Sequence, residues 1–276
     1  MKYLNVGCGK KYSKEDVWEN IDMDSHSKYV TSYNLLKGFP YEDNKFDVVY
    51  HSQVLEHIPK ENAEEFLKHC YRVLVKGGIL RVVVPDLENI INEYQKFLKQ
   101  NIENPTTESK ENYDWIMLEL YDQTIRNKSG GLMKEYLEKP TLENEEYLGK
   151  RMGFIGTQIR NRKDTVEPTG QKLKRILKEV GPMSFLSKLT TELKNRTLNL
   201  LVGDKYKVGN FRLGGEIHYW MYDKYSLGEL LKKVGFQEIK LKSPYESDIA
   251  DWNKYELDVK EDFAFDPTSL FMEAKK

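Results

Sequence analysis

The sequence predicts an α/β fold in which a mostly parallel sheet is interrupted by a large helical insert. Short apolar runs alternate with polar connections over the first 86 residues, which is typical of alternating strands and helices. Two of these runs, residues 47–50 and 79–84, are nearly continuous and rich in β-branched residues, as strands buried on both faces of a sheet are. Helical patterns follow, and strand-like runs return only near the end of the chain.

The residue patterns of the first part predict its individual elements. Residues 3–6, 19–23 and 30–33 are the other strand candidates. A helix is expected between the two strong strands, because apolar side chains recur there at steps of three and four. These side chains are Ala63, Phe66, Leu67, Cys70, Val73 and Leu74, and the pair Gly77 and Gly78 is expected to close the helix. A strand, a helix and a strand in this order predict a right-handed parallel crossover.

The rest of the chain is predicted to hold helices and then a short return to the sheet. The helices are expected at residues 87–100, 113–126, 173–180 and 185–201. The return is expected to hold a helix over residues 225–234, ended by Gly235, and strands over 237–241 and 269–274. We therefore divide the chain into an N-terminal part of the core (1–86), a mainly helical insert (87–215) and a C-terminal part of the core (216–276).

Composition and charge argue against several classes of protein. The 276 residues carry 43 Lys and Arg against 44 Asp and Glu, and a net charge of −1 gives no general attraction to nucleic acids. No apolar run reaches the roughly 20 residues of a membrane helix. The strand-like run at the start leaves no room for a signal peptide. Cys8 and Cys70 cannot form a disulfide framework, and neither has metal-ligand spacing. We expect a cytoplasmic protein without a metal site.

A glycine loop and an acid point to a nucleoside ligand. Gly7 and Gly9 follow the first strand, where the absence of a β-carbon lets a ligand approach the backbone closely. Asp22 ends the next strand, and a carboxylate beside such a loop can accept both hydroxyls of a ribose. The loop lacks the third glycine of a dinucleotide fingerprint, so an NAD-dependent enzyme is the disfavoured alternative. A glycine turn followed by a solvated acidic turn is the other alternative.

The order of several motifs resembles that of class I S-adenosylmethionine-dependent methyltransferases, in their small bacterial and archaeal branch. The matching stretches are residues 4–9 (LNVGCG), 21–24 (IDMD), 39–57 (FPYEDNKFDVVYHSQVLEH), 74–86 (LVKGGILRVVVPD) and 216–236 with 269–276. The resemblance covers residues 1–86 and about 215–276, and it does not extend to the insert. It implies a Rossmann-like, mostly parallel seven-stranded sheet and S-adenosylmethionine as the cofactor.

The resemblance also implies residues that contact the cofactor. The glycine loop would lie against the methionine part, Asp22 would hold the ribose, and the end of the fourth strand would meet the amino group through its backbone. The complete set is Gly7, Cys8, Gly9, Asp22, Met23, Asn34, Leu35, His51, Ser52 and Leu55. The helix that follows the loop in this family is shortened here to residues 10–17, so the methionine carboxylate would depend on loop amides or a lysine.

Methyl transfer needs an aimed nucleophile, and a hydroxyl acceptor also needs a base. His218 and His57 are the candidate catalytic residues, because histidine titrates near neutral pH. The alternative is that each is a hydrogen-bonded structural histidine. Asp86 is expected to cap the next helix rather than to act as a base, and Cys8 to pack rather than to react.

We predict a methyltransferase that acts on a small-molecule or glycan acceptor, with an oxygen nucleophile. A catalytically inactive methyltransferase-like binding or regulatory protein is the alternative. The insert carries a basic run over residues 150–178, which fits an acidic acceptor, an anionic lipid surface or simply a solvated helix face. Leucines within residues 185–201 are expected to pack on the core, and peripheral membrane contact and a homodimer stay open. Nucleic acid is not an expected partner.

Overall fold

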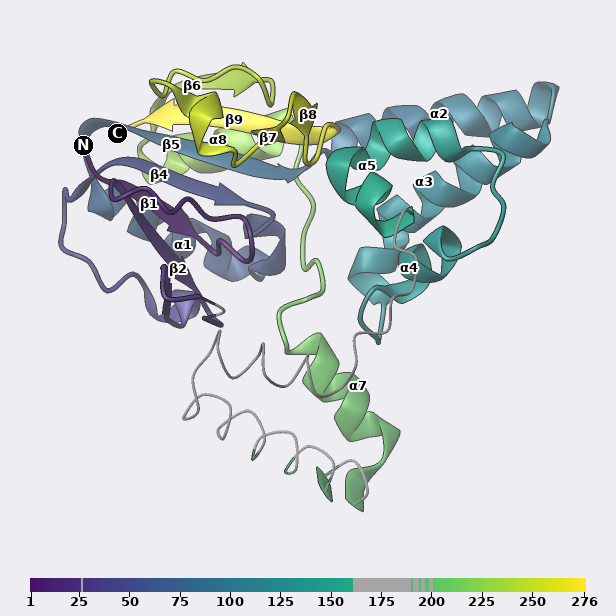
Figure 1. Cartoon of the computed structure of the whole chain (residues 1–276), viewed down its shortest axis with the longest axis horizontal. Helices are drawn as coiled ribbons and strands as arrows, with labels where there is room; N and C mark the ends of the chain where they lie inside the picture. The colour runs from purple at the N-terminus through teal and green to yellow at the C-terminus, as the bar shows by residue number, and fades with distance from the viewer. Residues whose placement is uncertain (26, 161–189, 191–193, 195–196, 199–200) are drawn as a thin grey trace.

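The main sheet of the protein has seven strands and is mostly parallel (Figure 1). The computed structural model describes residues 1–25, 27–160, 190, 194, 197–198 and 201–276. The strands are β1 (Tyr3–Val6), β2 (Trp18–Asp22), β3 (Val30–Ser32), β4 (Phe46–Ser52), β5 (Leu74–Pro85), β6 (Gln237–Lys242) and β9 (Ser269–Lys275). They lie in the order β3-β2-β1-β4-β5-β9-β6, with β9 antiparallel to both of its neighbours. The sequence-based prediction of the fold is therefore confirmed.

The two faces of this sheet are covered differently. Helices α1 (Lys60–Val73) and α8 (Lys224–Val234) pack on one face and bury Phe66, Leu67 and Leu227 in the larger core cluster. The other face carries an aromatic cluster that includes Tyr50 and Trp252, the latter in the short 3-10 helix η3 (Trp252–Tyr255). A small hairpin, β7 (Val259–Lys260) with β8 (Phe263–Ala264), follows η3.

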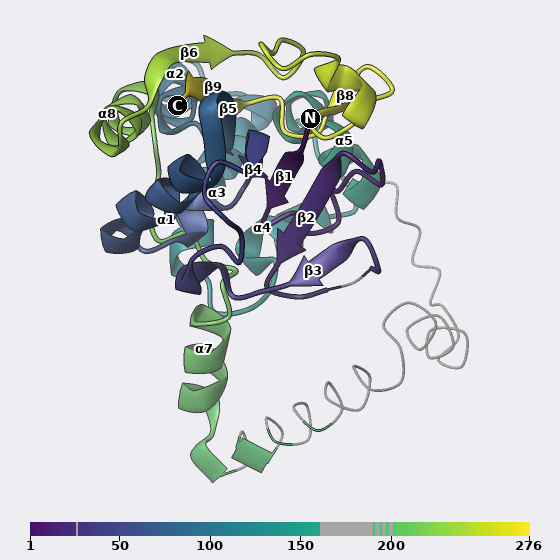
Figure 2. The same cartoon turned by 90° about the vertical axis from the view of Figure 1, so that its left-hand side faces the viewer.

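A helical group lies beyond the ends of β5 and β9 (Figure 1). It consists of α2 (Leu87–Glu103), α3 (Thr107–Ile125), α4 (Gly131–Leu137) and α5 (Glu145–Arg160). Its own small cores centre on Trp115 and Ile116, both fully buried. Helix α7 (Asp204–Arg212) buries no side chain and extends away from the sheet (Figure 2). Of the described helices, none is both long and apolar enough to cross a membrane.

The structure corrects one predicted helix near the sheet. No helix follows the glycine loop, because residues 7–17 form a loop rather than the shortened helix that was predicted. The segment after β4 forms one turn of 3-10 helix, η2 (Leu55–His57).

The predicted glycine exit of α1 was also wrong. The helix ends at Val73, and the chain enters β5 directly at Leu74, so Gly77 and Gly78 lie within the strand. A side chain at Gly78 would meet the carbonyl oxygen of Asp47 at 3.1 Å, which explains a glycine where β4 and β5 approach closely.

The helical insert is only partly described. Helix α3 begins at Thr107, earlier than predicted, and α4, α5 and α7 were not predicted. The helix predicted over residues 173–180 lies outside the described residues, and so does most of the one over 185–201. The division into residues 1–86, 87–215 and 216–276 stays a prediction.

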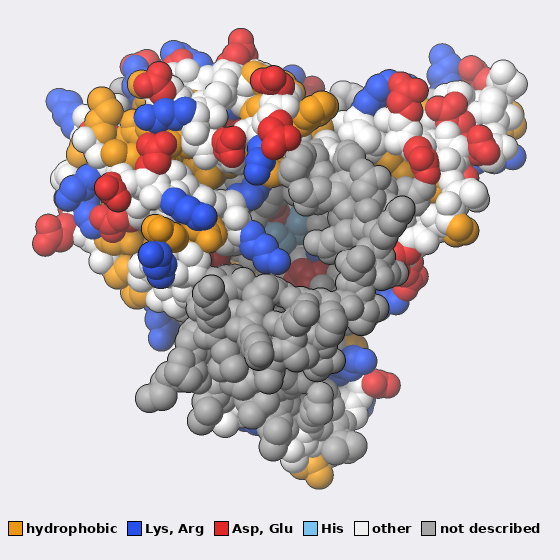
Figure 3. Space-filling view, in the orientation of Figure 1, with side chains coloured by type: hydrophobic (Ala, Val, Ile, Leu, Met, Phe, Trp, Pro, Cys, Tyr) orange, Lys and Arg blue, Asp and Glu red, His pale blue; other side chains and the backbone are white. Residues whose placement is uncertain are grey.

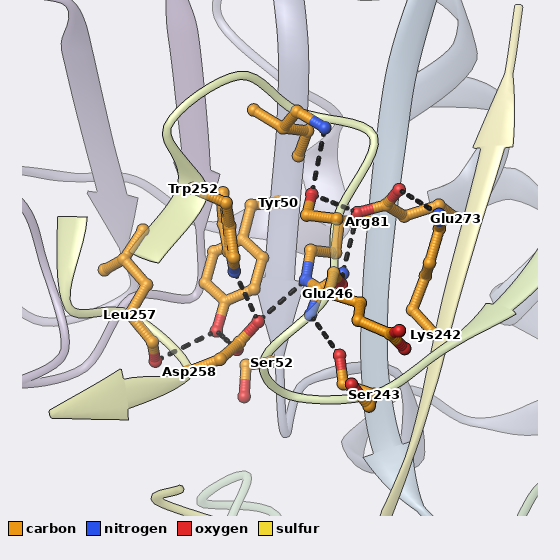
Figure 4. A network of polar contacts seen from close by, with 12 residues as sticks. Tyr50, Ser52, Arg81, Lys242, Ser243, Glu246, Trp252, Leu257, Asp258 and Glu273 are labelled. Atoms are coloured by element: carbon orange, nitrogen blue, oxygen red, sulfur yellow. Dashed lines mark hydrogen bonds and ion pairs between the residues drawn. The ribbon is translucent and has the colours of Figure 1, made fainter. Parts of the chain in front are cut away.

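A buried ionic cluster joins the end of the chain to the sheet (Figure 4). Arg81 of β5 is fully buried, and its Nε donates to Asp258 at 2.7 Å while its Nη1 donates to Glu273 of β9 at 2.7 Å. Asp258 also accepts from the Tyr50 hydroxyl at 2.6 Å and from the Trp252 indole at 2.9 Å. Two further guanidinium hydrogens reach the carbonyl oxygens of Glu246 and Ser243, each at 3.0 Å. Each charged group of this cluster therefore has hydrogen-bond partners.

Candidate active site

The glycine loop and Asp22 are held together at the carboxyl edge of the sheet. The Gly9 amide donates to Asp22 Oδ2 at 2.8 Å, and the Asp24 amide donates to Asp22 Oδ1 at 3.1 Å. Gly9 has a φ of +52°, and no atom lies within 4 Å of the place where its Cβ would be. Each carboxylate oxygen of Asp22 keeps a further acceptor position. The open backbone and the partly exposed carboxylate fit a nucleoside with a short tail.

Gly7 has a different role in the same loop. Its φ is +64°, and a Cβ there would lie 2.5 Å from a methyl group of Val54. The residue therefore lets the loop pack against the segment that follows β4. Cys8 is buried beside it, and burial raises the pKa of its thiol to about 12, so the thiol stays protonated at neutral pH.

Lys11 follows the glycine loop, and its amide donates to the carbonyl oxygen of Cys8 at 2.9 Å. The amides of Gly7 and Cys8 both donate to the carbonyl oxygen of Ile21, and the Gly9 amide is taken by Asp22. The Lys11 ammonium lies 3.0 Å from Asp266 Oδ2 and 3.2 Å from the Ser52 hydroxyl, and it is partly exposed. The three loop amides are occupied, and Lys11, although paired with Asp266, is a partly exposed cation beside the loop that an anionic tail could reach.

The other residues predicted to contact the cofactor divide into two sets. Asn34 and Met23 are exposed, and the Asn34 side chain caps the short helix η1 (Leu35–Lys37). The side chains of Leu35, His51 and Leu55 are buried in the core, where the His51 ring meets Phe66 edge to face. Ser52 lies beside Lys11 and so joins the set around the loop.

A cavity of about 540 Å³ opens where the strands β4, β5 and β9 face the helical group. Most of the residues that line it have polar side chains, and the indole of Trp115 also contributes to the wall. The polar ones include Gln53, His57, Asp86, Glu119, Gln123, Arg126, Arg151, Glu216, His218 and Asp266. A histidine side chain is visible in the hollow between the sheet and the helices (Figure 3). Asp86 accepts from the amides of Glu88 and Asn89, which confirms the expected helix cap.

The two arginines of the cavity are already paired. Arg151 donates to both carboxylate oxygens of Glu119, and Arg126 lies 3.5 Å from Glu216. Asp86 and Asp266 add two further acids to the walls. Among the described lining residues, acidic groups therefore outnumber the arginines.

His57 and His218 lie next to each other at one wall of the cavity. Their ring centroids are 4.6 Å apart and their planes are nearly perpendicular. Glu56, the residue before His57, is fully buried and places one carboxylate oxygen 4.0 Å from His57 Nε2. One ligand atom of each of Glu56, His57 and His218 lies within 4.8 Å of the others.

Burial dominates the protonation of this group. Burial raises the pKa of Glu56 to about 8 and lowers the pKa of His218 to about 2, with smaller contributions from His57 and Arg126 to the latter. The pKa of His57 is lowered as well, mainly by burial. Both imidazoles are therefore neutral at pH 7 and present lone pairs rather than charges.

Sequence reasoning missed several residues of this site. Glu56 entered only as a letter of the motif, and Arg126, Arg151 and Glu119 were not singled out as site residues. Gln53, which follows β4 beside the cavity, has a φ of +56°. Such a backbone angle often marks a functional position, but it is visible in the structure and not in the sequence. The convergence of Glu56 with His218 has no local signal, because 162 positions separate them.

Comparison with known proteins finds a family model that matches part of the chain and two solved structures with a similar fold. Residues 19–82 match the family model described as a methyltransferase domain. A SAM-dependent methyltransferase from Archaeoglobus fulgidus is 13% identical with a TM-score of 0.38, and the match covers 100% of this chain and 86% of that one.

The second likeness is to a SAM-dependent methyltransferase from Thermotoga maritima, 12% identical with a TM-score of 0.40, over 100% of this chain and 82% of that one. No curated protein matches the chain. Residues 19–82 are thus similar to a methyltransferase domain, and the sheet order and the acid at the glycine loop agree with that match.

Proposed function

We propose that the enzyme methylates a hydroxyl group of a small-molecule or saccharide acceptor that binds in the 540 Å³ cavity. The observation that carries this proposal is the position of the cavity, which adjoins both the Lys11–Asp266 pair and the histidines. Its walls offer many hydrogen-bonding groups around the buried indole of Trp115, a combination suited to a polyol.

The balance of charge favours a neutral acceptor over a phosphorylated one. Arg126 and Arg151 each lie beside an acid that offsets their charge, although the Arg126 Nε has no hydrogen-bond partner among the described residues. Asp86 and Asp266 would in addition repel an anion. The basic run that suggested an acidic acceptor continues into residues outside the described part of the chain.

The cofactor would be held by groups around the glycine loop. Asp22 would accept the ribose hydroxyls, the open side of Gly9 would admit the tail, and Lys11 would hold the carboxylate of the methionine part. The bound cofactor supplies a methyl group on a sulfonium, and the electron pair of the broken S–CH3 bond stays on sulfur. Gln53, which lies between Ser52 and the cavity, and the buried end of β4 would shield the reacting atoms from water.

The acceptor must lose one proton as its oxygen bonds to the methyl carbon. His57 is the stronger of the two candidate bases, because its Nδ1 is bonded to the carbonyl oxygen of Ile217 at 2.9 Å and Nε2 is left as an acceptor. His218, with a pKa near 2, is a weak base and would help to position the acceptor. Both histidines are thus proposed catalytic residues.

Calorimetry with S-adenosylhomocysteine tests the cofactor site. Asp22→Asn removes a charge-assisted hydrogen bond of about 1.5–3 kcal/mol, so binding should weaken about 10- to 100-fold. Asp16→Asn, at an exposed acid of the neighbouring loop, is the matched control and should bind as the wild type does. Equal binding by Asp22→Asn and wild type would contradict the proposed ribose contact.

Turnover with labelled cofactor then tests the acceptor class. Neutral sugars and oligosaccharides should accept the methyl group, and phosphorylated sugars should react more slowly. Cofactor binding without transfer to any hydroxyl acceptor would favour the alternative of an inactive binding or regulatory protein.

A further inference from the structure

We propose that Glu56, His57 and His218 bind one divalent transition-metal ion, such as Zn²⁺, at the wall of the acceptor cavity. The sequence had predicted no metal site, since the two cysteines lack ligand spacing and the three residues are separated along the chain. The role given to the ion below rests on the proposed function, whereas the site itself stands on the geometry of these side chains.

The donor atoms already converge. One ligand atom from each residue lies within 4.8 Å of the other two, and His57 Nε2 is 4.0 Å from Glu56 Oε1. Bonds of about 2.0–2.2 Å to a shared ion place neighbouring donors about 3–4 Å apart. A small inward rotation of the side chains would therefore complete the coordination.

Glu56 supports the proposal through its unusual surroundings. Its side chain has no exposed surface, and neither carboxylate oxygen has a hydrogen-bond partner among the described residues. A buried acid without partners is costly, so natural structures keep such a group where a ligand or an ion completes it. A cation between this carboxylate and the two imidazoles would supply the missing partner.

His57 has the second contact that metal-binding histidines commonly show. Its Nδ1 lies 2.9 Å from the carbonyl oxygen of Ile217, which can only accept, so Nδ1 carries the proton. Nε2 is then a lone pair, and it is the nitrogen that faces Glu56. A backbone carbonyl that fixes the tautomer and orientation in this way is typical of ligating histidines.

The backbone holds the three residues in place. The Tyr219 amide donates to the carbonyl oxygen of Glu56 at 2.7 Å, and the His218 amide donates to that of Gln123 at 2.9 Å. These two hydrogen bonds connect the segment before α8, which contains His218 and Tyr219, to η2 and to helix α3. The donors are thus fixed before any ion arrives, which lowers the cost of binding.

Two imidazoles and one carboxylate favour Zn²⁺, Co²⁺, Fe²⁺ or Mn²⁺ over Mg²⁺ and Ca²⁺, which prefer oxygen ligands. Three protein ligands leave a coordination position, and His57 and His218 both line the cavity. An acceptor hydroxyl at that position would lose its proton to water more easily, so with the ion bound His57 would act on the acceptor through the ion and not as the free base.

Cobalt uptake by chelator-treated protein tests the site. We expect one equivalent of Co²⁺ to bind, with visible absorption of nitrogen and oxygen coordination, and Zn²⁺ to displace it. Glu56→Gln and His218→Gln should each weaken Co²⁺ binding at least 10-fold. His69→Gln, at a partly exposed histidine of α1, is the matched control and should bind as the wild type does. His57→Gln is the further variant if one of the others fails to fold.

Three results separate this proposal from the proposed function. A wild-type protein that binds S-adenosylhomocysteine but no Co²⁺ overturns the metal site and leaves the methyltransferase intact. Co²⁺ uptake that survives in the folded triad variants also overturns the site. Co²⁺ uptake that depends on the triad, in a protein that methylates no hydroxyl, supports the metal site while the acceptor proposal fails.

Discussion

The molecule contains two buried groups of titratable side chains that differ in how far the protein itself satisfies their hydrogen bonds. Around Arg81, the carboxylates of Asp258 and Glu273 accept hydrogen bonds on every oxygen. Around Glu56, the carboxylate has no hydrogen-bond partner in the described chain, although two imidazoles face it. Both groups lie beside β4 and β5, yet only the second borders the cavity.

The difference indicates distinct roles. A buried charge surrounded by partners holds segments together, and Arg81 joins β5 and β9 to the loop that contains Asp258. A buried acid without partners contributes nothing to the fold and keeps its bonding capacity for something else. We therefore assign stability to the Arg81 cluster and ligand binding to the Glu56 group.

The largest effect should come from Arg81→Met. The substitution leaves the buried carboxylates of Asp258 and Glu273 without their cation, and we expect a loss of about 3–5 kcal/mol in the free energy of unfolding. Denaturant titration measures it. Lys68→Met, which breaks an exposed ion pair on α1, should change stability far less. A similar loss of unfolding free energy in both variants would contradict the idea that the buried ion pairs of Arg81 contribute more to stability than an exposed pair does.

Tyr50→Phe is a smaller test of the same cluster. It removes the hydroxyl that donates to Asp258 at 2.6 Å, and a lost bond to a carboxylate should cost about 2 kcal/mol. Tyr3→Phe is the matched control, since Tyr3 is buried in the same aromatic cluster but its hydroxyl meets the Met1 sulfur, at 3.4 Å, and the Tyr255 side chain rather than a buried carboxylate. Thermal unfolding of the two variants should rank them in that order, and the reverse order would contradict it.

Glu56→Leu should have the opposite sign. Replacing an unpartnered buried carboxyl with an apolar side chain should stabilise the metal-free protein by about 1–2 kcal/mol, while Co²⁺ binding disappears. Glu65→Leu, at an exposed acid of α1, serves as the control. A destabilised Glu56→Leu protein would show that the acid supports the fold after all.

His51 adds a pH dependence to the one expected from His218, whose pKa burial also lowers. Burial lowers the pKa of His51 to about 3, whereas an unfolded histidine has a pKa near 6.5. The unfolded state therefore binds more protons between these values, and stability should fall as the pH drops through this window, by up to about 1.4 kcal/mol per pH unit. His51→Phe should flatten that slope in unfolding curves between pH 6 and 4. An unchanged slope would mean that the buried ring takes up its proton in the folded state.

Some of the site was predictable because its parts are close in the sheet. Parallel strands place their carboxyl ends at one edge, so Gly9 after β1 and Asp22 at the end of β2 had to meet, and their hydrogen bond of 2.8 Å confirms that they do. The seven-stranded sheet followed from strand patterns and motif order for the same reason.

Other parts could not be predicted from local patterns. Arg81 read as one polar letter in a buried strand, and its partners Asp258 and Glu273 lie more than 170 positions away. Glycines misled as well, because Gly77 and Gly78 lie within β5 and do not end a helix; Gly77 has a φ of +78°, and Gly78 lies close to the backbone of Asp47.

The sequence by itself determined the strands, the helices beside the sheet and the glycine loop, because side-chain periodicity and turn residues act over a few positions. Only the tertiary structure decided which buried polar and charged side chains find hydrogen-bond partners. Arg81 meets two acids because β9 inserts beside β5, whereas Glu56 meets two histidines and no donor because the chain returns past η2 before α8. Pairing of buried charges depends on distances between segments, and those distances exist only in the folded chain.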